Sequence, residues 1–372
     1  MATRLESITK QRLEKLNRIR GRGIDPYPHC YHRTHTAKEA IILFEQWEKN
    51  ADGTLPEVSL AGRIMVSRAM GKVTFIDIRD GSGKIQVYFR NDLMSDGKYE
   101  LLKELDIGDI IGVSGELFRT HSGEVTLRAS DFTMLCKSLQ PLPEKWHGLV
   151  DVEKRYRQRY LDLISREEVR GIFRIRCRTI QAMRRFLDDR GFLEVETPVL
   201  QPSAGGALAR PFVTHHHALD QDLYLRIATE LHLKRLIVGG FDKVYEIGRI
   251  FRNEGISTKH NPEFTMLESY QAYADYNDVM KMGEEMVAYI ARETLGTTEV
   301  SFGDDTLDFS SPWQRISVRE AILKYCDVDF QEYPDAPSLR NRMLAMGMEM
   351  DESNAGLACV MRGSAASRTA AS

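Results

Sequence analysis

Residues 245–254 read YEIGRIFRNE, and after a polar loop that begins at Gly255, residues 261–268 read NPEFTMLE. Two strand-like runs on either side of a loop with glycine and proline predict an antiparallel hairpin. Arg252 and Glu254 are two positions apart, so within a strand their side chains would lie on one face. The stretch therefore predicts a sheet with charged side chains near the end of a hairpin.

The residue types in this hairpin suit nucleotide binding. An arginine can hold a phosphate or carboxylate through two hydrogen bonds, and a glutamate can accept one from an exocyclic amine. Phe264 can stack on an aromatic base. An isolated Arg and Glu on one strand face are more often a surface ion pair. The complete string, rather than that pair alone, favours a binding site.

The whole chain has the composition of a globular protein. It has 372 residues, 42% of them hydrophobic and 28% charged, which predicts two or three domains and excludes a disordered chain or a collagen-like fibre. Its apolar runs are far shorter than the ~20 residues that span a bilayer, and residues 1–6 lack the apolar core of a signal peptide. Five scattered cysteines without a C-x-x-C pair indicate reduced thiols, so we expect a cytoplasmic location and no membrane partner.

The formal net charge of −3 conceals an asymmetry along the chain. Residues 1–38 hold nine Lys and Arg against three Asp and Glu, whereas residues 271–352 hold seven against seventeen. A basic N-terminal arm that helps to hold a polyanion fits this pattern, and so does a solvated helix with surplus cations.

The period of the apolar residues divides the chain into regions. Residues 1–50 predict a basic helical arm. Residues 51–140 predict five short strands and one helical stretch at 99–105, the pattern of a closed Greek-key barrel of the OB type, which binds single-stranded nucleic acid on aromatic side chains. After a linker at 141–151, residues 152–190 predict a long arginine-rich helical region. Extended segments and helices then alternate irregularly to residue 340, which favours an antiparallel α+β domain. Residues 341–372 form an atypical tail that we expect to be disordered.

Several strings together resemble one family, the class II lysyl-tRNA synthetases. Residues 251–257 (FRNEGIS) and 260–266 (HNPEFTM) resemble that family's second class II motif, and residues 191–198 (GFLEVETP) resemble the first, which builds the dimer interface. Residues 205–212 (GGALARPF) and 225–231 (LRIATEL) resemble its amino-acid-binding segments, and residues 156–163 (YRQRYLDL) are typical of it. The resemblance runs from about residue 5 to 330. It implies a homodimer in which an OB-fold barrel precedes an antiparallel-sheet catalytic domain.

The resemblance also implies a reaction and a role for each matched residue. The carboxylate of L-lysine attacks the α-phosphate of ATP, and the lysyl group of the adenylate then passes to the tRNA for lysine. Arg252 would be the catalytic residue, bridging the α-phosphate and the lysine carboxylate. The other matched ATP-binding residues are Glu254 and Phe264 at the adenine, and His260 and Asn261 on the loop around ATP.

For L-lysine, the resemblance implies contacts from Gly206 and Glu230 to its backbone and from Glu268 and Tyr270 to its side chain. An acidic pocket suits a cationic substrate, because a buried ammonium without a partner is costly. Glu230 could instead merely complement the dipole at the start of a helix. In the barrel, Phe75 and Gln86, with Arg63 nearby, match positions that contact the tRNA anticodon, although Phe75 could equally be barrel core.

Two features point away from a metal site or a complete enzyme. Adjacent residues of the triplet His215–His217 point to opposite sides of a strand and lack a further ligand, so we assign no metal there. The third class II motif, with its arginine for the γ-phosphate, is not found after residue 271. The carboxylates that hold Mg²⁺ in the family are also expected beyond this chain. We therefore expect a C-terminally truncated or frame-shifted chain that is inactive or weak as a ligase.

Two alternative functions stay open from the sequence. One is a non-catalytic fragment that still binds tRNA through the arm and barrel. The other, which the residues favour less, is an aspartyl- or asparaginyl-tRNA synthetase of the same architecture. The string at 205–212 and the pairing of Glu268 with Tyr270 look like the lysine branch.

Overall fold

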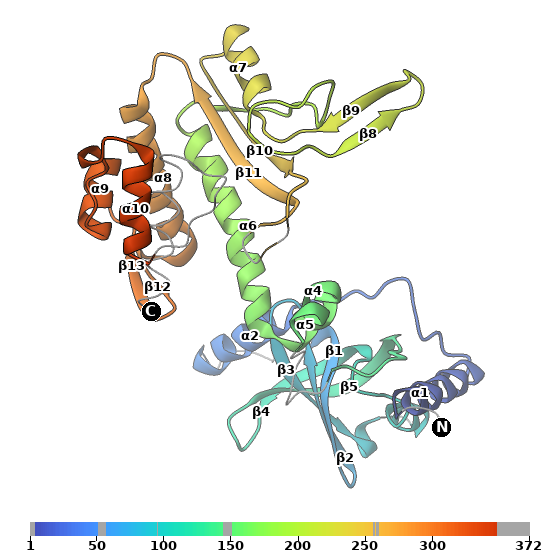
Figure 1. Ribbon diagram of the computed structural model, residues 1–372. Coiled ribbons are helices and arrows are strands. Elements are labelled where there is room, and N and C mark those ends of the chain that lie inside the picture. Colours follow the sequence, from blue (N-terminus) through green and yellow to red (C-terminus); the bar gives the residue numbers. More distant parts are fainter. Residues whose placement is uncertain are drawn as a thin grey trace. The chain divides into compact units, whose positions relative to one another are not determined.

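The computed structural model describes residues 4–50, 57–94, 96–143, 151–255, 257 and 260–347. The chain divides into two compact units, residues 1–171 and 172–372 (Figure 1). Each unit is described by itself below.

The first unit is built on a closed barrel with the strand order β1-β2-β3-β5-β4. Its strands are β1 (Val58–Met70), β2 (Val73–Arg79), β3 (Lys84–Arg90), β4 (Ile110–Arg119) and β5 (Val125–Cys136). Alternating apolar side chains such as Ile76, Val87 and Leu127 fill its interior and are at most 1% exposed. This confirms the predicted OB-type barrel. Its helix α3 (Asp96–Leu102), which follows η1 (Asn91–Leu93), begins three residues before the predicted stretch.

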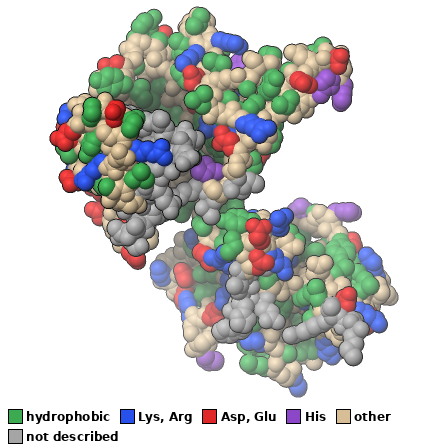
Figure 2. Space-filling model, viewed as in Figure 1, with side chains coloured by type: hydrophobic (Ala, Val, Ile, Leu, Met, Phe, Trp, Pro, Cys, Tyr) green, Lys and Arg blue, Asp and Glu red, His purple; other side chains and the backbone are tan. Residues whose placement is uncertain are grey.

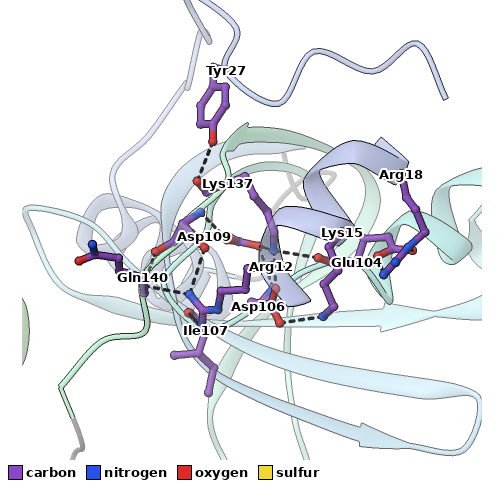
Figure 3. Close-up of polar contacts among 11 residues, drawn as sticks. Arg12, Lys15, Arg18, Tyr27, Glu104, Asp106, Ile107, Asp109, Lys137 and Gln140 are labelled. Carbon is purple, nitrogen blue, oxygen red and sulfur yellow. Dashed lines mark hydrogen bonds and ion pairs between the residues drawn. The ribbon is translucent and has the colours of Figure 1, made fainter. Parts of the chain in front are cut away.

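The basic arm contains two helices, α1 (Arg4–Gly21) and α2 (Ala37–Asn50), and part of its charge faces the barrel (Figure 3). The buried guanidinium of Arg12 donates to three main-chain carbonyls of the barrel unit at 2.9–3.0 Å. Lys15 and Arg18 pair with Asp106 and Glu104 at 2.7 and 2.9 Å. Arg12, Lys15 and Arg18 therefore anchor α1 to the barrel unit, an arrangement that the charge count alone did not distinguish. The exposed cations of the arm include Lys10 and Arg20 on α1 and Arg22 just after it.

The helical region predicted over 152–190 consists of three helices: α4 (Val152–Arg157), α5 (Arg159–Ser165) and α6 (Glu167–Asp188). The breaks fall at Gln158 and Arg166, whose ψ angles of 54° and 114° are not helical. At the end of α5, Arg170 donates to the carbonyl of Leu163 at 2.9 Å and Arg79 donates to the next carbonyl. These arginines satisfy carbonyl groups that a continuing helix would have used.

The second unit holds the predicted hairpin. Strands β10 (Lys243–Phe251) and β11 (Glu263–Gln271) pair antiparallel from Phe251 opposite Glu263 to Lys243 opposite Gln271, which confirms the hairpin. The short β6 (Leu193–Glu194) pairs parallel with β10. A second sheet has the order β7-β9-β8, formed by β7 (Leu200–Gln201), β9 (Gln221–Leu225) and β8 (Val213–His216). Helix α7 (Glu230–Val238) follows β9 and contacts both hairpin strands.

The rest of the unit comprises α8 (Tyr276–Leu295), β12 (Glu299–Phe302), β13 (Asp305–Asp308), α9 (Val318–Cys326), η2 (Phe330–Glu332) and α10 (Ala336–Ala345). Helix α10 continues past residue 340, and Met343 is buried beside Ile322 and Val328. Residues 348–372, most of the predicted tail, lie outside the described residues. Within the described part of the chain, no helix is both long and apolar enough to cross a membrane.

Candidate active site and nucleic-acid groove

One face of β11 carries three of the predicted site residues. Phe264, Glu268 and Tyr270 are separated by even numbers of positions, so their side chains share a face of the strand. Their partners on β10, which share that face, are Ile250, Glu246 and Val244. The predicted adenine and lysine contacts therefore follow one another along a single strand.

The five predicted ATP-binding residues lie together at the open end of the hairpin. With Gly255, they line a hollow of about 300 Å³: Arg252, Glu254, His260, Asn261 and Phe264. The expectation that Arg252 and Glu254 are strand residues is wrong, since β10 ends at Phe251. The amide of Asn253 donates instead to the carbonyl of Arg210 at 2.7 Å, and the amide of Glu254 donates to the carbonyl of Arg252 at 3.0 Å. This tight turn, rather than a strand, brings both side chains to the hollow.

Arg252 lies between the nucleotide side and the amino-acid side of the site. Its guanidinium carbon is 5.3 Å from the centroid of the Phe264 ring. Its Nε and Nη2 donate to the carbonyl of Ile227 at 3.4 and 3.5 Å, which are long hydrogen bonds. A guanidinium has five N–H donors, so weak bonds to one carbonyl leave capacity to hold an anion.

Glu268 and Tyr270, which the sequence predicts to contact the lysine side chain, are hydrogen-bonded to each other. The amide of Thr229 donates to Oε1 of Glu268 at 3.1 Å, and the hydroxyl of Tyr270 donates to Oε2 at 3.3 Å. Burial raises the pKa of Tyr270, and the nearby charges of Glu268 and Glu230 raise this pKa further. The phenol therefore stays protonated and acts as a donor at neutral pH.

Gly206 packs directly against the start of α7. Its φ of +88° favours glycine, and a Cβ there would lie 3.1 Å from the Cβ atoms of Ala228 and Glu230. Glu230 is the first residue of α7, where an acid also complements the helix dipole. Gly206, Glu230, Glu268 and Tyr270 thus lie around the start of α7.

Sequence reasoning missed the buried ion pair beside this site. Arg226 and Glu246 are 3% and 4% exposed and pair with each other, and Thr197 donates to Oε2 of Glu246 at 2.7 Å. A Cβ on Gly248 would lie 2.1 Å from Nη2 of Arg226. A glycine within a strand can mark such a close approach, and this was the available signal.

The barrel presents an aromatic groove on its outer surface. Phe75 lies between the buried residues Thr74 and Ile76 and is half-buried, so the reading of Phe75 as barrel core is wrong. Its ring centroid is 5.2 Å from that of Tyr88, which is 5.7 Å from that of Phe118. The groove has a volume of about 730 Å³.

Groove residues that the sequence did not single out include Tyr88, Phe118 and Arg128, whose guanidinium lies 4.9 Å from the Phe118 ring. The signal that could have found Tyr88 is its position directly opposite Phe75 in the β2–β3 pair.

Gln86 and Arg63 do not line this groove. Gln86 is 6% exposed, donates to Glu124 at 3.1 Å and accepts from Thr126 at 3.1 Å. In the register of β1 and β2, Arg63 lies opposite Arg79, whereas Phe75 lies opposite Arg68, five positions further along β1. Because β1 has a bulge between Ile64 and Val66, Arg63 and Phe75 are four residues apart along β2, roughly 13 Å.

The histidine triplet lies at the tip of the β8–β9 hairpin, where Figure 2 shows histidine side chains gathered. Nδ1 and Nε2 of His215 lie 2.9 and 3.3 Å from Asp222 and Asp220. Among the residues that the structure describes, no group of three or more His, Cys, Asp and Glu side chains is placed to hold a metal ion.

Comparisons with known proteins agree with this geometry. Residues 151–361 match the family of class II tRNA synthetases (D, K and N), and residues 58–135 match the OB-fold nucleic acid binding domain. The lysine–tRNA ligase of Dehalococcoides mccartyi is 58% identical over 346 residues, which cover 93% of this chain and 70% of the relative. The chain belongs to the lysine–tRNA ligase family of class II aminoacyl-tRNA synthetases.

Other lysine–tRNA ligases are similar over the same extent. That of Moorella thermoacetica is 57% identical over 340 residues, covering 91% of this chain and 68% of the relative. That of Carboxydothermus hydrogenoformans is 54% identical over 348 residues, covering 94% and 70%. The class II match spans the whole β10–β11 hairpin, and the OB-fold match spans all but the last residue of the five-stranded barrel.

Proposed function

We propose that the site on β11 serves the ATP-dependent ligation of L-lysine to its tRNA. The observation that carries the proposal is the common face of Phe264, Glu268 and Tyr270, with Arg252 between the nucleotide hollow and the acidic pocket. Class II synthetases use ATP, and a hollow with an aromatic wall, a carboxylate and a guanidinium suits its adenine and phosphates.

The reaction has two steps in this proposal. A carboxylate oxygen of lysine attacks the α-phosphorus of ATP, the bond to the bridging oxygen breaks, and pyrophosphate leaves. A hydroxyl of the terminal adenosine of the tRNA then attacks the lysyl carbonyl, and AMP leaves. Arg252 would hold both the lysine carboxylate and the α-phosphate, so its contribution is positioning and charge stabilisation.

The acidic pocket would select the substrate. Glu268 and Tyr270 would receive the side-chain ammonium of lysine, and Glu230 with the backbone of Gly206 would hold the α-amino end. The relatives, all lysine–tRNA ligases at 53–58% identity, support this branch over an aspartate or asparagine enzyme.

We also propose that the 372-residue chain by itself makes lysyl-adenylate slowly or not at all. Its sequence has no third-motif string, so the γ-phosphate arginine has no counterpart. Among the described residues, no cluster of carboxylates is placed to hold Mg²⁺. Losing one preorganised charge contact commonly costs about 10²–10³ in kcat. Lysine-dependent exchange of labelled pyrophosphate into ATP should therefore run at least ~100-fold below that of a full-length relative, and a comparable rate would refute this.

A tRNA-binding role without catalysis is the second candidate, and the complete barrel favours it. Phe75, Tyr88 and Phe118 would stack anticodon bases, and Arg128 would contact the backbone. Binding of the tRNA for lysine with a steep salt dependence, but without adenylate formation, would select this function.

The dimer belongs to the same proposal. On α6, which directly precedes the first-motif string at 191–198, Ile172, Phe173 and Ile175 are 64%, 43% and 42% exposed. An apolar helix face of this kind suits burial against a second copy. Sedimentation of the chain as a monomer at micromolar concentration would contradict it.

A further inference from the structure

Lys234 places an ammonium of the protein itself in the predicted lysine pocket. It lies one turn after Glu230 on α7, and its Nζ is 2.6 Å from Oε1 of Glu230. The same Nζ is 5.9 Å from the centroid of the Tyr270 ring, within the range of a cation–π contact. Lys234 therefore contacts two of the four residues proposed to hold the substrate, Glu230 and Tyr270.

These contacts close a ring of residues around the pocket. Lys234 joins Glu230 to Tyr270, the Tyr270 hydroxyl donates to Glu268, and Glu268 accepts from the amide of Thr229, the neighbour of Glu230 in the chain. Lys234 therefore contacts both the Glu230 carboxylate and the face of the Tyr270 ring.

The charges of the ring match those of the substrate. Glu230 and Glu268 contribute −2 and Lys234 contributes +1, so the ring carries −1, whereas free lysine at neutral pH carries +1. Oε1 of Glu230 accepts from Lys234, and a carboxylate keeps further acceptor sites for the α-ammonium of the substrate. Arg252, the other nearby cation, faces the carboxylate end of the substrate in the proposed function.

We propose that Lys234 is a positioning residue for lysine binding, which orients Glu230 and tunes the pocket for a ligand with one net positive charge. This inference rests on the proposed function of the pocket. The simpler account is a helix-surface pair four residues apart, half-exposed at Lys234, which would affect only the stability of α7. The two accounts differ in what they predict for ligand binding.

The test is titration calorimetry of the full 372-residue chain with L-lysine, with L-lysinamide and with ATP. Lysinamide lacks the carboxylate and carries +2 when both amines are protonated. We expect Lys234→Met to raise the Kd for lysine by about 5- to 10-fold, the scale of one charge-assisted contact, and to leave the Kd for ATP within about twofold. The ratio of the lysine Kd to the lysinamide Kd should rise, because the variant ring carries −2. Lys234→Arg should restore both values to within about twofold.

Arg157→Met is the matched control, since Arg157 forms an exposed pair with Glu153 at the same helical spacing outside the site. It should leave all three Kd values unchanged. Lysine binding by Lys234→Met with the wild-type Kd and the wild-type selectivity would overturn the inference while leaving the proposed function intact. Failure of the wild-type chain to bind lysine would overturn the proposed function, and the inference with it.

Discussion

Replacing Lys137 with methionine tests how the N-terminal arm and the barrel are held together. The Lys137 side chain is fully buried, and its Nζ donates to the carbonyl of Glu104 at 2.9 Å, to Asp106 at 2.5 Å and to Asp109 at 2.7 Å (Figure 3). Asp106 also receives Lys15 of α1. Lys137→Met therefore removes the cation at the centre of this network and leaves the fully buried Asp109 without it.

The size of the effect follows from Asp109. Burial already raises the pKa of Asp109, against the attraction of Lys137. In the variant we expect the buried Asp109 carboxyl to take up a proton rather than stay charged. Protonating a carboxyl with an ordinary pKa near 3.9 costs 1.36 kcal/mol for each pH unit above that pKa, or about 4 kcal/mol at pH 7. Breaking a buried ion pair costs a similar ~3–5 kcal/mol. Because the folded-state pKa lies above the unfolded one, the loss grows as pH rises above ~4 and shrinks by about 1.4 kcal/mol per unit as pH falls.

Amide hydrogen exchange of β4 and β5 peptides in the full chain reads this loss locally. We expect opening free energies lower by about 4 kcal/mol at pH 7 and about 3 kcal/mol at pH 6 after correction for intrinsic exchange rates. Lys103→Met, which removes an exposed pair with Glu100, is the control and should change them by less than ~0.5 kcal/mol. Adding Asp109→Asn should remove the pH dependence. A loss below ~1 kcal/mol, or one independent of pH, would refute the reasoning.

Three further predictions concern other parts of the chain. Gly248→Ala should displace Arg226 from Glu246 and lower the free energy of unfolding of the second unit by about 3–5 kcal/mol, measured by urea unfolding with Trp313 fluorescence. Gly283→Ala, whose Cβ would meet open space, should not lower that free energy in this way. Tyr88→Ala should weaken binding of the tRNA for lysine by about 1–3 kcal/mol without changing the salt slope, because no charge is lost, whereas Arg128→Ala should reduce that slope by about one. Burial raises the pKa of Asp80, but hydrogen bonds from Ser82, Ala37 and Gly83 outweigh burial and lower this pKa overall. The charged Asp80 therefore stabilises the folded barrel above about pH 4, and this stabilisation is lost as the pH falls. Asp80→Asn should accordingly make the stability of the barrel less steeply dependent on pH between about 5 and 3 in hydrogen exchange, and an unchanged slope would contradict this.

The sequence predicted those parts of the fold that depend on neighbouring residues. Alternating side chains and a loop with glycine and proline define β10 and β11 locally, so the antiparallel hairpin could be predicted from the sequence. The tight turn at Arg252 did not follow, because its partners, the carbonyls of Arg210 and Pro262, are set by tertiary contacts.

Ion pairs between residues far apart in the sequence explain why the charge count could not show which cations of the arm are already paired. Lys15 and Arg18 meet acids 91 and 86 residues away, and no local pattern reveals such pairs. The break between α5 and α6 has a similar origin, since Arg79 of the barrel takes a carbonyl 85 residues further along. Tyr88 was different: its register opposite Phe75 could have been worked out from the short β2–β3 turn.

The most direct test of a lysine site at Glu268 is titration calorimetry of the full chain and of Glu268→Gln with L-lysine, and separately with L-aspartate. We expect the wild type to bind lysine saturably and not to bind aspartate. We further expect a loss of about 10-fold or more in lysine affinity for Glu268→Gln, because a charge-assisted contact is removed, with ATP affinity unchanged. Equal lysine affinity in the two proteins, or aspartate binding as tight as that of lysine, would contradict a lysine site at Glu268.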